Sequence, residues 1–143
     1  MIKTIKNSGK GKAIEAAQSM IDTDYVAIHD ADLEYFPSDI VEMFNLARDN
    51  PDVLILGSRF YGNKSRENIY IRTDLANRFL SLFFSIVNLY KVSDIASCYK
   101  MMPSKFFKEN KFNQKGFAYD IEILSKYLKY NKFIIEHPIK YEG

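Results

Sequence analysis

Hydrophobic and polar residues alternate along this chain with two different periods, and each change of period marks a new element. Helical spacing over residues 11–21 is followed by a short apolar segment at 25–28, which predicts a helix and then a strand. Ser38 is placed to cap a second helix that ends near residue 50. The continuous apolar run 53–56 is typical of a strand covered on both faces. This part of the chain therefore predicts a strand, a crossover helix and a second strand of a parallel sheet.

The second half of the chain predicts two further helices with short strands between and after them. A long helical pattern covers about residues 72–90, and another covers 119–130. One strand is expected within residues 95–102 and a last one at 133–135. The expected fold class is therefore α/β, with a Rossmann-like sheet and flanking helices in a single domain over residues 1–143.

The most hydrophobic stretch, residues 79–90, contains no charged side chain. It is shorter than the roughly 20 residues needed to span a bilayer. We favour a helix that is buried against the sheet. The alternative is a helix that lies on a membrane surface, with Arg72 and Arg78 directed toward lipid phosphates.

Charge and cysteine content narrow the classes of function. The 20 basic and 18 acidic residues give a net charge of +2, which argues against a dedicated nucleic-acid-binding protein. The single cysteine, Cys98, excludes an intrachain disulfide and fits a reducing compartment. The amino terminus has no apolar segment typical of a secretory signal. We therefore expect a cytoplasmic protein, with peripheral contact at the inner face of the membrane left open.

Three carboxylates follow the strand predicted at 25–28. Asp30, Asp32 and Glu34 occupy alternate positions, so on an extended backbone they would project to the same side and repel one another. A shared Mg²⁺ or Mn²⁺ would relieve that repulsion, because both ions prefer hard oxygen ligands. Taken alone, such a motif is more often a helix cap or a solvated turn, and Asp39 has that interpretation as well.

A second polar set follows the strand predicted at 53–56. Ser58 and Arg59 come directly after it, and strand ends of a parallel sheet meet at one edge. These residues also have purely structural interpretations that compete with a functional one. Arg59 could pair with a surface carboxylate, and Asp120 could be a favourable charge at the start of a helix.

Several segments, taken in order, resemble the second half of the catalytic domain of glycosyltransferase family 2, in the branch of dolichol-phosphate and polyprenyl-phosphate sugar synthases. The segments are NSGKGKAIEAA, DYVAIHDADLEYFPSDI, LILGSRF, SDIASCYKM, GFAYDIEIL and IIEHPIKYEG. The resemblance implies a partial GT-A nucleotide-sugar transferase fold whose amino-terminal βαβ half is absent. It also implies sugar transfer from a nucleotide diphosphate sugar, with inversion, to a polyprenyl phosphate or a glycan.

The resemblance assigns a role to each matching position. Asp94, Arg59 and Arg72 would be catalytic: the arginines would meet donor and acceptor phosphates, and Asp94 would close the acceptor side. If the acceptor were a sugar hydroxyl, Asp94 would be the candidate base. Asp32 would bind the metal with Glu34 as a second ligand. The donor and its cofactor would contact Lys10, Lys12, Asp30, Asp32 and Asn77.

The missing half leaves two hypotheses open. The chain could carry the metal and acceptor side of an active glycosyltransferase within a longer chain, with a complementary chain, or as a homo-oligomer. Alternatively, it could be a non-catalytic remnant or interaction module that keeps the fold without turnover. The first hypothesis requires nucleotide-sugar binding that depends on Mg²⁺ or Mn²⁺.

Overall fold

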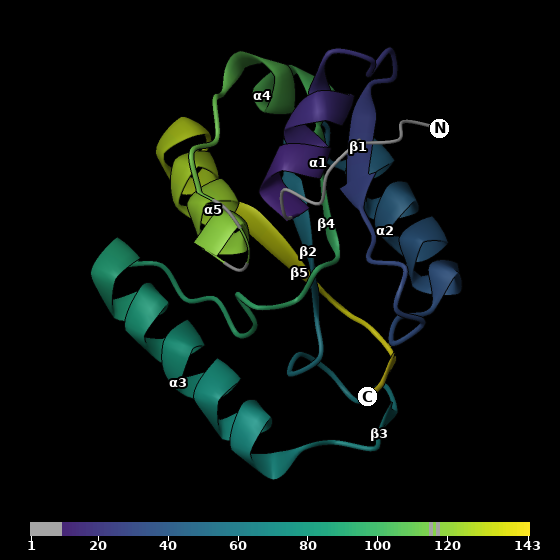
Figure 1. The fold of residues 1–143 in the computed structure, drawn as a ribbon, viewed down its shortest axis with the longest axis vertical. Coiled ribbons are helices and arrows are strands. Elements are labelled where there is room, and N and C mark those ends of the chain that lie inside the picture. The colour runs from purple at the N-terminus through teal and green to yellow at the C-terminus, as the bar shows by residue number, and fades with distance from the viewer. Residues whose placement is uncertain (1–9, 115, 117) are drawn as a thin grey trace.

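The computed structural model describes residues 10–114, 116 and 118–143, which form layers of helices around a small sheet (Figure 1). The helices are α1 (Lys10–Gln18), α2 (Pro37–Asp49), α3 (Ile71–Asn88), α4 (Ser104–Glu109) and α5 (Ala118–Tyr130). The strands are β1 (Tyr25–Ile28), β2 (Leu54–Ser58), β3 (Arg66–Glu67), β4 (Lys100–Pro103), β5 (Ile134–Pro138) and β6 (Tyr141–Glu142).

The main sheet has the strand order β1-β4-β2-β5 and is mixed. β4 is antiparallel to both β1 and β2, whereas β2 and β5 are parallel. The expectation of an all-parallel sheet is therefore wrong, because the antiparallel β4 lies between the strands predicted at 25–28 and 53–56. Since both are antiparallel to β4, they still run in the same direction, and their carboxyl ends reach the same edge of the sheet.

Each face of the sheet has its own apolar core. Leu54 and Leu56 of β2 pack with α4 and α5, including Phe106 and Ile123. Ile55 points to the opposite face, because successive side chains alternate along a strand, and it packs with Met43 of α2. The continuous apolar run of β2 thus reflects cover on both faces, as predicted.

The start of α2 differs from the expectation. Phe36 occupies the cap position without a side-chain hydrogen bond, so the prediction that Ser38 caps the helix is wrong. Pro37 begins the helix, which suits a residue that has no amide hydrogen to satisfy. Asp39 is buried rather than solvated: it accepts hydrogen bonds from Nζ of Lys64 at 2.8 Å and from the amide of Lys140 at 2.7 Å.

The helix α3 has about the expected length, but it is not buried against the sheet as expected. Of its residues only Ser81 and Phe84 are buried, and in Figure 1 the helix lies along one side, apart from the main sheet. Its exposed apolar residues are Ile71, Leu75, Phe79, Leu80, Leu82, Phe83, Ile86 and Val87. The prediction of a helix buried against the sheet is therefore wrong. Within the described residues, no helix is long and apolar enough to cross a membrane.

Three short elements were not expected. The strand predicted within 95–102 is confined to β4, while α4 and the small parallel sheet of β3 and β6 have no counterpart in the predicted elements. β6 continues from β5 and brings Tyr141 opposite Tyr35 through an isolated bridge. This small sheet places the end of the chain beside the loop that follows β1.

Candidate functional site

The loop after β1 carries the three predicted carboxylates, but it is not extended. The chain bends over residues 31–34, and Leu33 has a left-handed φ of 67°. Asp32 accepts a hydrogen bond from the amide of Glu34 at 3.2 Å, which closes a local Asx turn. The expectation that all three carboxylates project to one side of an extended strand is therefore wrong.

Asp30 is held by a lysine rather than by its acidic neighbours. Nζ of Lys10 lies 3.1 Å from Asp30 and 3.3 Å from Asp120. Asp120 also accepts a hydrogen bond at 2.9 Å from Lys100, which is fully buried. Burial lowers the pKa of Lys10, but the two carboxylates outweigh it and raise the pKa, so Lys10 stays charged. Asp120 is thus part of a buried ion network, not simply a solvated charge at a helix start.

Lys12 lies outside that network. It pairs at 3.5 Å with Glu15 on the exposed surface of α1. Of the two lysines predicted to border a donor pocket, the structure brings only Lys10 to the strand ends.

Among the described residues, the carboxylates of this loop do not form a metal cage with other side chains. Within residues 10–114, 116 and 118–143, no three His, Cys, Asp or Glu side chains gather as a metal cluster. The side chain of Glu34 lies beside Tyr141, where burial and this carboxylate raise the pKa of the tyrosine. Asp32 is exposed. A surface carboxylate of this kind suits Mg²⁺ or Mn²⁺ that takes most of its ligands from a diphosphate and water, but not an all-protein cage.

Arg59 and Asp94, predicted from separate motifs, meet at the end of β2. Asp94 is fully buried and accepts hydrogen bonds from Nε and Nη2 of Arg59 at 2.8 and 2.9 Å. The guanidinium also lies 5.0 Å from the ring centre of Tyr141. Burial lowers the pKa of Arg59, but Asp94 outweighs burial and raises it, so Arg59 stays charged. Arg59 therefore pairs with a buried loop carboxylate, not with a surface helix.

A serine network supports this pair. The hydroxyls of Ser58 and Ser93 are 2.6 Å apart, and both the amide and the hydroxyl of Ser93 donate to Glu136 at 2.7 Å. Gly57, just before Ser58, has no room for a side chain, because a Cβ atom there would lie 2.7 Å from Cβ of Tyr99. These contacts fix residues 57–59 against residues 93–94.

The two predicted residues on α3 have different surroundings. Arg72 is exposed at the second position of the helix. Asn77 is half-buried and, with Asp120 and Ile95, lines a cavity of about 100 Å³ between α3, α5 and the segment before β4. The structure therefore brings Asn77 toward the Lys10 network and leaves Arg72 at the surface.

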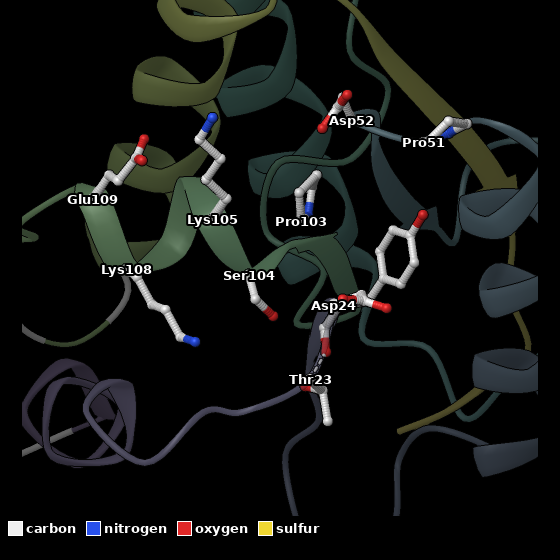
Figure 2. A pocket seen from close by; sticks show the side chains of 10 residues that line it. Thr23, Asp24, Pro51, Asp52, Pro103, Ser104, Lys105, Lys108 and Glu109 are labelled. Carbon is white, nitrogen blue, oxygen red and sulfur yellow. Dashed lines mark hydrogen bonds between the residues drawn. The ribbon is translucent and has the colours of Figure 1, made fainter.

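A larger pocket lies at the opposite edge of the sheet. Its volume is about 460 Å³. Figure 2 shows it between α4, the turn at Pro51 and Asp52, and the residues Thr23 and Asp24 that precede β1. It opens where β1 begins, whereas the predicted site residues Asp30 and Arg59 follow the ends of β1 and β2. We therefore place the candidate site at the carboxyl edge and not at this pocket.

Comparisons with known proteins agree with this fold. The family model described as Glycosyl transferase family 2 matches residues 1–111. The crystal structure of glucosyl-3-phosphoglycerate synthase from Mycobacterium tuberculosis in complex with uridine diphosphate is similar, with a TM-score of 0.71 and 17% identity over 99% of this chain and 48% of that one. A mycobacterial protein is also similar, with a TM-score of 0.68 and 13% identity over 98% of this chain and 44% of that one. This chain thus spans about half the length of these structures.

Proposed function

Because the chain belongs to glycosyl transferase family 2, we propose that it carries the metal and acceptor side of an inverting glycosyltransferase that uses a nucleotide diphosphate sugar. One observation supports this best: Asp30 and Asp32 follow β1 at the same edge of the sheet where Arg59 follows β2. This edge holds carboxylates that can bind a metal and, at the end of β2, an arginine. Binding sites at the carboxyl ends of strands are the general rule for open α/β sheets.

On the donor side, Asp32 is the residue we propose to hold Mg²⁺ or Mn²⁺, with Glu34 as the second candidate ligand. When bound, the metal supplies positive charge against the leaving diphosphate. The role of Lys10 is to hold Asp30 in place from the buried side, where Asp120 secures the lysine. Asp30 then faces the nucleotide in a fixed orientation.

On the acceptor side, we propose different roles for the two arginines. Nε and Nη2 of Arg59 already donate to Asp94. We therefore propose that Asp94 acts mainly by positioning Arg59 at the end of β2. Arg72 is exposed and able to meet an acceptor phosphate. A phosphate acceptor is already ionised near neutral pH and needs orientation rather than a base. A sugar-hydroxyl acceptor would require Asp94 to release Arg59 before it took a proton.

The apolar surface of α3 supports a lipid phosphate, such as a polyprenyl phosphate, as the acceptor. Leu75 and Phe79 are exposed one and two turns beyond Arg72. A hydrocarbon chain or a membrane surface could cover them while Arg72 binds the phosphate. We also propose that the rest of a longer chain, a complementary chain or a second copy completes the donor site.

Calorimetric titration with UDP and GDP, with and without Mn²⁺, tests the donor side. UDP is the first choice, because the mycobacterial synthase was solved with it. We expect Mn²⁺-dependent binding that Asp32→Ala abolishes, since it removes a proposed ligand rather than core. Asp22→Ala, in another exposed loop, is the matched control and should bind like the wild type. A well-folded protein that binds neither nucleotide would favour the non-catalytic alternative.

A further inference from the structure

Two arginines that are far apart in sequence stack on one aromatic ring. The guanidinium carbon of Arg66, in β3, lies 4.6 Å from the ring centre of Phe60, and that of Arg78, in α3, lies 4.2 Å from it. Phe60 directly follows Arg59 at the end of β2. Stacking on a ring fixes the plane of a guanidinium and leaves its edge available for an oxyanion.

The charges around this ring do not cancel. Arg66 and Arg78 share one carboxylate, Asp74, which pairs with Nη2 of Arg66 and accepts a hydrogen bond from Nε of Arg78 at 2.9 Å. Burial raises the pKa of Asp74, but the arginines outweigh it and hold the pKa below its usual range. Two cations thus face one anion. Glu67 follows Arg66 in β3 and therefore projects to the other side of that strand.

One buried donor beside this ring is unpaired. Nε of Arg66 is buried and, in the part of the chain that the structure describes, has no hydrogen-bond acceptor. Leaving such a donor unpaired is costly, and a bound ion or water is the usual remedy. Arg66 lines a cavity of about 30 Å³ together with Arg59 and with its own carboxylate partner Asp74. This volume admits one oxygen-sized group.

We propose that Arg66 and Arg78, held by Phe60 and Asp74, form a binding site for a phosphate monoester. A phosphate monoester is close to a dianion near neutral pH and offers three acceptor oxygens to the guanidinium donors that Asp74 leaves free. Arg78 lies on the same helix as Arg72, to which we assign the acceptor phosphate, so the biological ligand of the site would be the acceptor. That last step rests on the proposed function, but phosphate binding itself can be measured without turnover.

The phosphate could belong to a soluble compound or to a lipid headgroup. Both present the same oxyanion to the arginines. Phe79 is exposed next to Arg78, so a lipid could place its apolar part along α3 while its phosphate binds the arginines. The experiment therefore needs one soluble probe and one lipid probe.

Inorganic phosphate is the soluble probe, titrated calorimetrically into the full chain. We expect Arg66→Gln and Arg78→Gln each to weaken binding by about tenfold or more, since each removes a charge-assisted contact. Arg48→Gln, on the exposed surface of α2, is the control and should not change the affinity. Arg78 is half exposed, so its variant separates lost binding from lost folding if Arg66→Gln unfolds.

Phosphate binding that both glutamine variants weaken and the control keeps would support the site. Failure of the folded wild type to bind phosphate, or equal affinity in wild type and Arg78→Gln, would overturn it.

Co-sedimentation with phosphatidylcholine vesicles, with and without phosphatidic acid, then identifies whether the bound phosphate belongs to a lipid or to a soluble compound. Sedimentation that needs phosphatidic acid and is reversed by phosphate supports a lipid headgroup, whereas phosphate binding without sedimentation supports a soluble ligand. UDP titration of the same samples separates failure of this site from failure of the donor site.

Discussion

Asp94 binds one edge of the Arg59 guanidinium, through Nε and Nη2, and also the backbone amide of that residue. Its Oδ2 accepts hydrogen bonds from Nε at 2.8 Å and from the Arg59 amide at 3.0 Å, while Oδ1 accepts from Nη2 at 2.9 Å. The pair connects the end of β2 to the segment that precedes β4. Because both side chains are nearly excluded from solvent, this contact bears on stability as well as on the proposed acceptor site.

Asp94→Asn should destabilise the fold strongly. The substitution leaves the buried charge of Arg59 without a partner, which costs about 3–5 kcal/mol in comparable buried pairs. Urea denaturation measures the free energy of unfolding. Asp49→Asn removes an exposed carboxylate beside Arg48 and should change that energy by less than about 1 kcal/mol. Similar small losses in both variants would contradict the structural role of Asp94.

The pair between Lys64 and Asp39 predicts a pH dependence. Burial lowers the pKa of Lys64, but hydrogen bonds to Asp39 and Glu42 outweigh burial and raise it above 10.5. A raised folded-state pKa means that the stabilisation is complete below pH 10.5 and is lost as the pH rises through the folded value. Lys64→Met should therefore cost about 3 kcal/mol near pH 8, and less as the pH passes 10.5.

Denaturation of wild type and Lys64→Met across this pH range provides the test. Lys12→Met is the control, because Lys12 pairs with the exposed Glu15 and both side chains are more than half accessible. A difference between wild type and Lys64→Met that stays constant up to high pH would rule out the ion pair as its source.

Cys98 should be nearly inert in the folded protein. The side chain is buried, and burial raises the pKa of the thiol to about 12. The reactive thiolate is therefore scarce at pH 8, and access is blocked as well. Alkylation followed by mass spectrometry should be slow in native buffer and rapid in denaturant. Equal rates in the two conditions would show that the segment from Asp94 to Cys98 opens readily.

The sequence predicts those parts of the fold that depend on local periodicity. The patterns of α2, α3 and α5 extend over several turns, so their spacing is distinctive. The two-residue strands β3 and β6 are too short to show a period. The place of β4 between β1 and β2 depends on contacts between distant segments, which periodicity does not encode.

The same limit applies to the candidate site. Arg59 and Asp94 belong to recognisable segments, but their pairing joins residues that are 35 positions apart. Lys10 and Asp120 are 110 positions apart and have the same appearance in sequence as solvated charges. Nothing in the sequence marks Arg66 as a site residue, because only the fold brings it to Phe60. A helical period also shows which residues share a face, but not what covers that face, which is why the exposure of α3 was missed.

The exposed face of α3 leads to a last prediction, that it contacts an anionic membrane surface. Phe79, Phe83 and Ile86 are all more than half exposed on a stretch without charges. Cations flank this stretch, with Arg72 and Arg78 before it and the exposed Lys91 after it. A lipid surface with anionic headgroups matches that distribution, because apolar side chains can enter the interface while the cations meet the headgroups.

Vesicle co-sedimentation of the variant Phe79→Ser/Phe83→Ser tests this contact. Each serine removes an aromatic side chain that is exposed, so folding should be kept while binding to anionic vesicles falls by tenfold or more, about 1.4 kcal/mol. The control Phe44→Ser removes a partly exposed phenylalanine on α2 and should bind like the wild type. If the serine pair left vesicle binding unchanged but converted a dimer to a monomer in light scattering, a second copy of the chain would be the partner of α3.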